Sequence, residues 1–206
     1  MKELLSLKEL QLDALKEVAN IGAGHAATAM SQMTGSTIMI SVPTITIAQL
    51  EDVPSQIHED EEPIAAVLMQ MRGDLTGRTL LVFPRQTATR IAALMLRREV
   101  RQPAEFGPLE ESAIKEAGNI LSGAYMNALS EFLGLMLLPS PPSLAIDMSS
   151  AVLTTAYLQF GTDRDFVFAV ETEFFLSDMG EALRGFFLLL PDLDSLQAIL
   201  RAVRVS

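Results

Sequence analysis

The chain has 206 residues, of which 49% are hydrophobic and 20% are charged, a composition typical of a folded globular protein. Its formal net charge of −11 argues against a nucleic-acid-binding protein, because phosphates require a basic surface, but it permits a basic protein partner. The absence of cysteine excludes disulfides, thiolate metal sites and thiol nucleophiles, and suits the reducing cytoplasm. No run of about 18 apolar residues is present, so we expect no membrane span.

The first half of the chain predicts, in order, a long helix, two short strands, a hairpin and a second helix. Apolar residues at helical spacing mark the long helix, and its interior glycines, Gly22 and Gly24, indicate a tight packing contact. Pro43 interrupts the two short strands, because it has no N–H to give to a sheet. The acidic stretch 51–62 is expected to form a surface loop. The expected ranges are about 6–35 for the long helix, 37–41 and 44–47 for the short strands, 64–71 and 78–83 for the hairpin, and 84–96 for the second helix.

The second half repeats this order after a charged linker at residues 97–106. It predicts a long helix, a short strand that ends at a group of prolines, a pair of strands and a closing helix. The expected ranges are about 109–133, 135–138, 165–175, 184–190 and 192–203.

A polar pattern occurs once in each half, and the two copies are offset by 99 residues. It joins an acidic or hydroxyl residue, a glutamate, an asparagine and a distant proline: Asp13, Glu17, Asn20 and Pro43 in the first copy, and Ser112, Glu116, Asn119 and Pro142 in the second. The same offset aligns residues of other chemistry, including Gly24 with Gly123, so we interpret the chain as a tandem duplication. We expect one domain, 1–206, built of two repeats at about 6–97 and 107–203.

The glutamate and asparagine of each copy are three residues apart and therefore project from one face of a helix. One such pair alone is more often a solvated polar face, but the presence of both residue types in two copies favours a specific task. An Asn carboxamide cannot act as a nucleophile or a base, but it can orient a water by donating one hydrogen bond and accepting another. A glutamine has this role in GTPases. Because a nearby carboxylate can hold a cation of a partner, the pattern predicts hydrolysis of a phosphoryl group presented by another protein.

Other chemistry-bearing residues give weaker signals. His25 and His58 are the only histidines, and no set of His, Asp and Glu has metal-ligand spacing, so we expect no metal site. Gly22 and Gly24 lie inside a helix rather than after a strand, so they do not predict a phosphate-binding loop.

The motif residues resemble the CheC/CheX/FliY family of chemotaxis phosphatases, in which the same residue types occur at these spacings. Residues 20–28 and 119–123 closely follow the two active-site helices of that family, and the resemblance covers essentially the whole chain. Both copies of the motif are complete, as in CheC-type members. The departures are small: Lys16 and Lys115 lie beside the motifs, and His25 replaces a common Asn.

The resemblance implies an α+β fold in which two pseudo-symmetric halves share an antiparallel sheet, with the two motif helices on one face. It implies that phosphorylated CheY is the substrate, that the motif glutamates contact a Lys of CheY, and that the motif asparagines orient the hydrolytic water. The protein then needs no cofactor of its own, because the Mg²⁺ and the aspartyl phosphate belong to CheY. A second implied partner is the receptor deamidase CheD.

Two alternatives belong to a different functional class. The protein could be a non-catalytic binder of phosphorylated CheY, or chiefly a CheD-binding regulator of receptor modification. Turnover separates them from the phosphatase, because a catalyst works at substoichiometric amounts and a binder does not.

The candidate CheD-binding residues lie in a stretch expected only in the second half. Pro84 and Pro191 are offset by 107 residues rather than 99, so we place eight additional residues within 147–159. Apolar residues at helical spacing predict a short helix there, which either caps the sheet or docks CheD. The candidate contact residues are Asp147, Ala151 and Val152.

Overall fold

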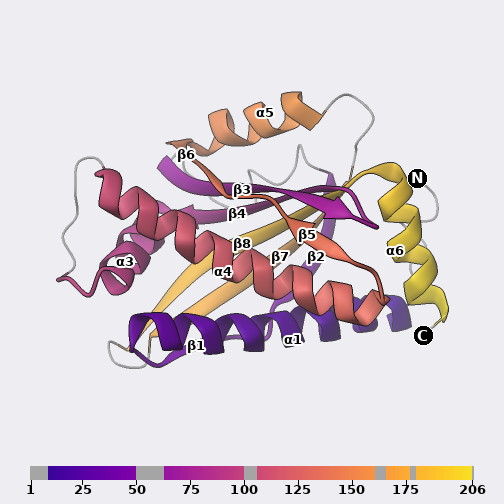
Figure 1. The fold of residues 1–206 in the computed structure, drawn as a ribbon, viewed down its shortest axis with the longest axis horizontal. Coiled ribbons are helices and arrows are strands. Elements are labelled where there is room, and N and C mark those ends of the chain that lie inside the picture. The colour runs from indigo at the N-terminus through magenta and orange to yellow at the C-terminus, as the bar shows by residue number, and fades with distance from the viewer. Residues whose placement is uncertain (1–8, 50–62, 100–105, 161–165, 177–179, 206) are drawn as a thin grey trace.

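The computed structural model describes residues 9–49, 63–99, 106–160, 166–176 and 180–205. It contains an eight-stranded sheet in which all neighbouring strands are antiparallel. Figure 1 shows α1 and α4 side by side on one face of the sheet, with α3 and α6 near opposite ends and α5 on the other face. No helix within the described ranges is long and apolar enough to cross a membrane.

The helices and strands of the two halves follow the same order. The first half forms α1 (Glu9–Thr34), β1 (Ile38–Ile40), β2 (Thr44–Gln49), β3 (Pro63–Gly73), β4 (Gly77–Pro84) and α3 (Arg85–Met95). The second half forms α4 (Pro108–Leu133), β5 (Leu137–Pro139), β6 (Ser143–Met148), α5 (Ser149–Phe160), β7 (Phe166–Leu176), β8 (Glu181–Pro191) and α6 (Leu193–Val205). The expected α+β fold is confirmed, and most elements lie within a few residues of their expected ranges.

Two expectations fall outside what the structure describes, and one strand was not expected. The acidic stretch 51–62, which includes His58, and the start of the first helix near residue 6 lie outside the described residues. Strand β6 was missed because the prolines at 139, 141 and 142 suggested irregular structure. These prolines instead end β5 at the sheet edge and link it to β6, and both strands pair with β3.

The ends of the motif helices follow from their sequences. Pro108 begins α4, where its missing N–H costs no hydrogen bond, and Glu110 and Glu111 complement the positive end of the helix dipole. Gly134 ends α4 with φ of 64°, and Gly35 follows α1 with φ of 76°, a left-handed conformation that favours glycine.

The halves are joined by an exchange of strands. The order is β1-β7-β8-β4-β3-β5, so β1 and β2 of the first half pair with β7 of the second, while β5 and β6 pair with β3. The register of this pairing is repeated as well. Thr44 of β2 lies opposite Glu171 of β7, and its counterpart Ser143 of β6 lies opposite Leu68, which occupies the same place in β3 as Glu171 does in β7. Neither half therefore completes its part of the sheet without the other.

The two halves differ less around α5 than the sequence suggested. Residues 149–165 connect β6 to β7, and residues 50–62 connect β2 to β3, so the connections differ by four residues. Asp147 belongs to β6 and corresponds to Ala48 of β2. The short helix is confirmed as α5, but the placement of all eight additional residues within 147–159 is wrong, because the remaining ones lie in the β7–β8 hairpin.

The motif helices α1 and α4 run antiparallel and meet closely at Gly22 (Figure 1). A Cβ at Gly22 would lie 2.8 Å from Cδ1 and 3.1 Å from Cα of Tyr125, so a larger residue would have to separate the helices. The Tyr125 ring stacks on Phe187 of β8 with centroids 4.7 Å apart, and its hydroxyl lies 2.9 Å from Oγ1 of Thr172. Burial raises the pKa of the Tyr125 phenol, although the hydrogen bond to Thr172 opposes the shift. The expected tight contact is confirmed at Gly22.

Candidate functional site

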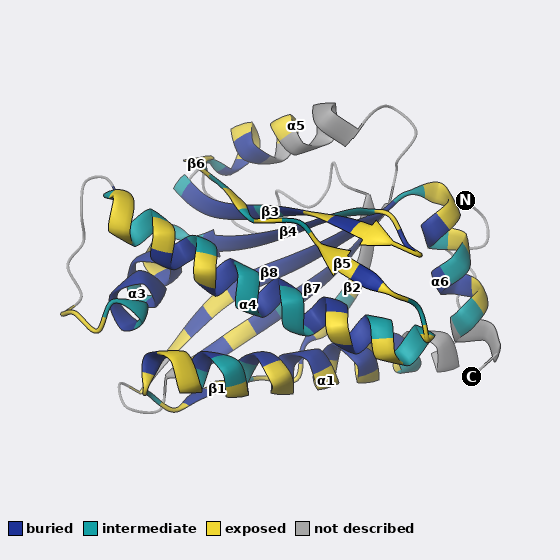
Figure 2. Ribbon diagram, viewed as in Figure 1, coloured by how far each residue is buried: buried dark blue, intermediate teal, exposed yellow. Residues whose placement is uncertain are grey.

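The first motif lies on the outward face of α1. Asp13, Glu17 and Asn20 are exposed, whereas Leu15 and Val18 are buried against the sheet. Figure 2 shows the same division along the helix, with exposed residues facing outward. The amphipathic pattern of α1 therefore presents the glutamate and the asparagine to a partner molecule.

The second motif has the same placement on α4, with one difference. Ser112 and Glu116 are exposed, and Asn119 is half-buried, while Ile114 and Ala117 are fully buried. The asparagine of α4 is thus more enclosed by neighbouring atoms than its counterpart on α1.

The two motifs lie on opposite sides of the helix contact. Asn20 precedes Gly22 by two residues, and Asn119 precedes Tyr125 by six. Because the helices are antiparallel, the two asparagines are separated by on the order of 12 Å along the helix axes, at 1.5 Å per residue. The structure therefore contains two separate Glu–Asn pairs rather than one combined cluster.

The charges beside the two motifs differ. Nζ of Lys16 lies 3.1 Å from Oδ1 of Asp13, an exposed ion pair of small energy. In the second motif Ser112 replaces the aspartate, and the structure gives Lys115 no ion pair with any described residue. The α1 motif is consequently one unit more negative than the α4 motif.

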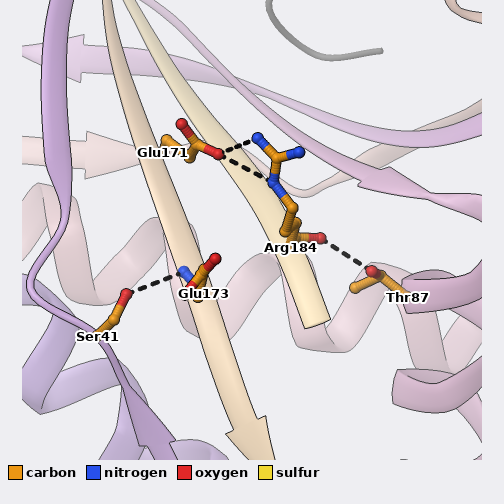
Figure 3. A network of polar contacts seen from close by, with 5 residues as sticks. All are labelled: Ser41, Thr87, Glu171, Glu173 and Arg184. Atoms are coloured by element: carbon orange, nitrogen blue, oxygen red, sulfur yellow. Dashed lines mark hydrogen bonds and ion pairs between the residues drawn. The ribbon is translucent and has the colours of Figure 1, made fainter. Parts of the chain in front are cut away.

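The motif prolines lie between the short strands at the sheet edges. Pro43 is buried before β2, and two residues earlier Ser41 is fixed to β7 (Figure 3). The backbone N–H of Ser41 donates to the carbonyl oxygen of Glu173 at 2.9 Å, and the N–H of Glu173 donates to Oγ of Ser41 at 3.3 Å. This arrangement holds the bend at Pro43 against the sheet.

The second proline has an equivalent anchor. Pro142 is half-buried before β6, and Ser140 makes the matching pair of bonds to Gln70 of β3, both 2.9 Å long. The motif prolines thus belong to the strand exchange that joins the halves, at a distance along the chain from the Glu–Asn pairs.

Sequence reasoning did not identify the polar network that connects β7, β8 and α3. Arg184 forms an ion pair with Glu171, and Oγ1 of Thr87 donates to the carbonyl oxygen of Arg184 at 2.9 Å (Figure 3). The residues of this polar network come from different elements and have no common sequence spacing. No group of three or more His, Asp or Glu within the described ranges could hold a metal ion.

The candidate deamidase-binding residues gather at one end of α5. Asp147 is exposed, and its Oδ1 accepts a hydrogen bond of 2.8 Å from the N–H of Met148. Ala151 is exposed, whereas Val152 is only 7% exposed and belongs to the same buried apolar cluster as Ile64 of β3. A cleft of about 270 Å³ between α5 and the sheet is lined in part by Asp147, Ala151 and Val152.

The expected packing contact is wrong for Gly24. In the part of the chain that the structure describes, no heavy atom outside its own helix lies within 4 Å of the position that a Cβ at Gly24 would take, and the same holds for its counterpart Gly123. Gly22 points inward and Gly24 outward because two helical residues differ by about 200° in direction. The sequence could reveal this difference only through the phase of the buried residues.

Comparison with known proteins places both motifs within matched segments. The model of the CheC-like family matches residues 10–47 and 109–146. The chain is 31% identical over 202 residues to "CheY-P phosphatase CheC" of Bacillus subtilis (strain 168), and the match covers 97% of each chain. It is 28% identical over 141 residues to "Flagellar motor switch phosphatase FliY" of the same organism, covering 68% of this chain and 36% of that one. The crystal structure of Thermotoga maritima FliY superimposes with a TM-score of 0.77 at 25% identity, covering 97% of this chain and 98% of that one.

Proposed function

Because the chain belongs to the CheC-like family, we propose that it is a response-regulator phosphatase that hydrolyses the aspartyl phosphate of phosphorylated CheY. The observation that carries this proposal is the 31% identity along 97% of the chain to a protein named as a CheY-P phosphatase. A response regulator as substrate implies that the protein acts in the cytoplasm.

We assign the positioning of the hydrolytic water to Asn20 and Asn119. Both project from outward helix faces, so each can enter the active site of a docked regulator. A carboxamide can donate to one acceptor and accept from the attacking water, which aligns the water for attack on phosphorus. CheY supplies the aspartyl phosphate and Mg²⁺, and therefore the phosphatase adds orientation rather than a new nucleophile.

We assign docking to Glu17 and Glu116. Each is exposed and lies one helical turn before its asparagine, so it can contact a lysine beside the phosphate site of CheY. The net charge of −11 adds long-range attraction for a basic patch on the partner. A charge pair of this kind fixes orientation and accelerates association.

Turnover tests the proposed function directly. Phosphorylated CheY incubated with the protein at about one hundredth of its concentration should lose phosphate in many cycles per phosphatase chain, as measured by phosphate release. If the protein instead protects the phosphoryl group of CheY, or if phosphate release stops at one equivalent per phosphatase chain, the result would support the non-catalytic binder.

The phosphatase should contain no catalytic metal of its own. After extensive dialysis, elemental analysis should find no metal at stoichiometric levels, because the chain has no cysteine, two histidines and no ligand-spaced acidic cluster. Chelators should nevertheless stop dephosphorylation by removing Mg²⁺ from CheY, and added Mg²⁺ should restore it. A tightly retained zinc or iron would contradict this assignment.

We further propose that the deamidase CheD docks at the Asp147 end of α5. The exposed carboxylate of Asp147, the small exposed Ala151 and the adjacent cleft support close approach of a partner there. Val152 contributes by anchoring α5 to the sheet, because its own side chain is buried.

Replacing Asp147 by Lys should weaken CheD binding by roughly 2 kcal/mol or more, because charge reversal at a buried polar contact leaves like charges or unpaired groups. Isothermal titration with CheD measures the change, and basal CheY dephosphorylation should stay near normal. Equal loss of CheD binding and phosphatase activity would make α5 structural, and no loss of either would place CheD elsewhere.

A further inference from the structure

Two glycines lie inside the motif helices at positions where the fold does not require glycine. Gly24 follows Asn20 by four residues, and Gly123 follows Asn119 by four. Neither has a positive φ, and among the described residues no heavy atom outside its own helix lies within 4 Å of the position of an added Cβ at either one. An alanine would fit both positions and would favour the helix, since interior glycine destabilises a helix relative to alanine.

The other interior glycines of these helices have an evident internal reason. A Cβ at Gly22 would meet Tyr125 at 2.8 Å, and a Cβ at Gly118 would meet Cγ1 of Val67 at 2.6 Å. Helix–helix packing explains the first glycine, and helix–sheet packing explains the second. Packing among the described residues does not explain Gly24 and Gly123, which leaves contact with a partner molecule as the reason for glycine there.

The position of Gly24 and Gly123 relative to the motif asparagines suggests why a side chain is absent there. Residues four apart lie on the same face of a helix, and each Cα–Cβ bond tilts toward the helix N-terminus. A side chain at position 24 would therefore cover surface over the preceding turn, which carries Asn20, and a side chain at position 123 would do the same beside Asn119. The asparagine side chain is short, so a partner must approach the helix closely to be reached by its carboxamide.

We propose that Gly24 and Gly123 act as positioning residues that keep the surface beside Asn20 and Asn119 free for the phosphorylated regulator. A backbone segment of the regulator next to its phosphate site lies directly against each glycine, and this contact sets the depth to which the asparagine enters. The inference rests on the proposed phosphatase function, which it extends to the fit between helix and regulator.

Alanine at either glycine should stabilise the protein and weaken its action on the regulator. Gly24→Ala and Gly123→Ala should each raise Tm by about 1–4 °C, as expected for replacing an interior helix glycine in a chain of this size. The affinity for CheY activated by beryllofluoride should fall about tenfold when both are replaced, and leucine should weaken it further. Gly22→Ala should differ by lowering Tm, because its Cβ meets Tyr125.

Single-site backgrounds show whether each glycine serves its own motif. In an Asn119→Ala chain, where only the α1 motif is intact, Gly24→Leu should lower kcat/KM for phosphorylated CheY at least tenfold. In an Asn20→Ala chain, the same change should have a much smaller effect. The matched control is Gln86→Leu, which places an apolar side chain at an exposed position on α3. It should leave kcat/KM for phosphorylated CheY unchanged in both backgrounds.

The outcomes separate this inference from the proposed function. If the unmodified chain does not turn over phosphorylated CheY, the proposed function fails. If the unmodified chain is active and the alanine and leucine variants match it in affinity and rate, the positioning role of the glycines is wrong. A lower Tm for Gly24→Ala and Gly123→Ala would make both glycines structural, and equal losses in the two backgrounds would overturn their assignment to separate motifs.

Discussion

The combined replacement of Asn20 and Asn119 by Ala is expected to abolish nearly all acceleration of CheY dephosphorylation while preserving binding. Loss of a group that aligns the attacking water should cost on the order of 10²-fold in kcat at its own site. Either single replacement should leave the other motif active, because the Glu–Asn pairs are separate on α1 and α4. Phosphate release measures the rate, and titration with beryllofluoride-activated CheY measures the affinity.

The control for this experiment removes a carboxamide elsewhere. Gln86→Ala removes an exposed amide from α3, outside both motif helices, and the rate of this variant should be normal. A double asparagine variant that dephosphorylates CheY at the normal rate would contradict the assignment of roles. A variant that loses binding together with rate would move the asparagines from catalysis to docking.

Much of the fold could be predicted because its elements are long and strongly patterned. The apolar periodicity of α1 and α4 and the continuous apolar runs of β3 and β8 identify these elements directly. Strand β6 could not be found this way, because Pro142 immediately precedes it and its residues alternate only between exposed and half-buried positions. Its pairing with β3 depends on the other half of the chain, which local sequence patterns do not report.

The sequence identified the candidate site residues but not their arrangement. The spacing of Glu17 and Asn20 predicts one helix face, and the structure places both residues exposed on α1. The antiparallel course of α1 and α4 (Figure 1) separates the two motifs, and local sequence patterns do not report it. Gly22 and Gly24 carry the same propensity in the sequence, and only the position of Tyr125 shows that one packs internally and the other does not.

Reversing the charge of both motif glutamates, with Glu17→Lys and Glu116→Lys, is expected to eliminate detectable binding of phosphorylated CheY. Each new lysine would face the lysine of CheY that the glutamate contacts in the proposed complex, so attraction becomes repulsion at both motifs. Lys16 and Lys115 adjoin these positions and would strengthen the repulsion. The fold should persist, because both glutamates are exposed and surface substitutions usually change stability by no more than about 0.5 kcal/mol.

A matched control separates this local contact from the overall charge of the protein. Glu99→Lys with Asp194→Lys makes the same change in net charge at exposed positions outside both motif helices, after α3 and in α6. This variant should lose only the long-range attraction, which salt screens over about 10 Å at 0.1 M ionic strength, and should therefore bind almost normally in a titration at moderate salt. Equal weakening in both double variants would reduce the role of the glutamates to net charge, and unchanged affinity after the motif reversal would remove the Glu–Lys contact. Loss confined to the motif variant is the result that assigns docking to Glu17 and Glu116.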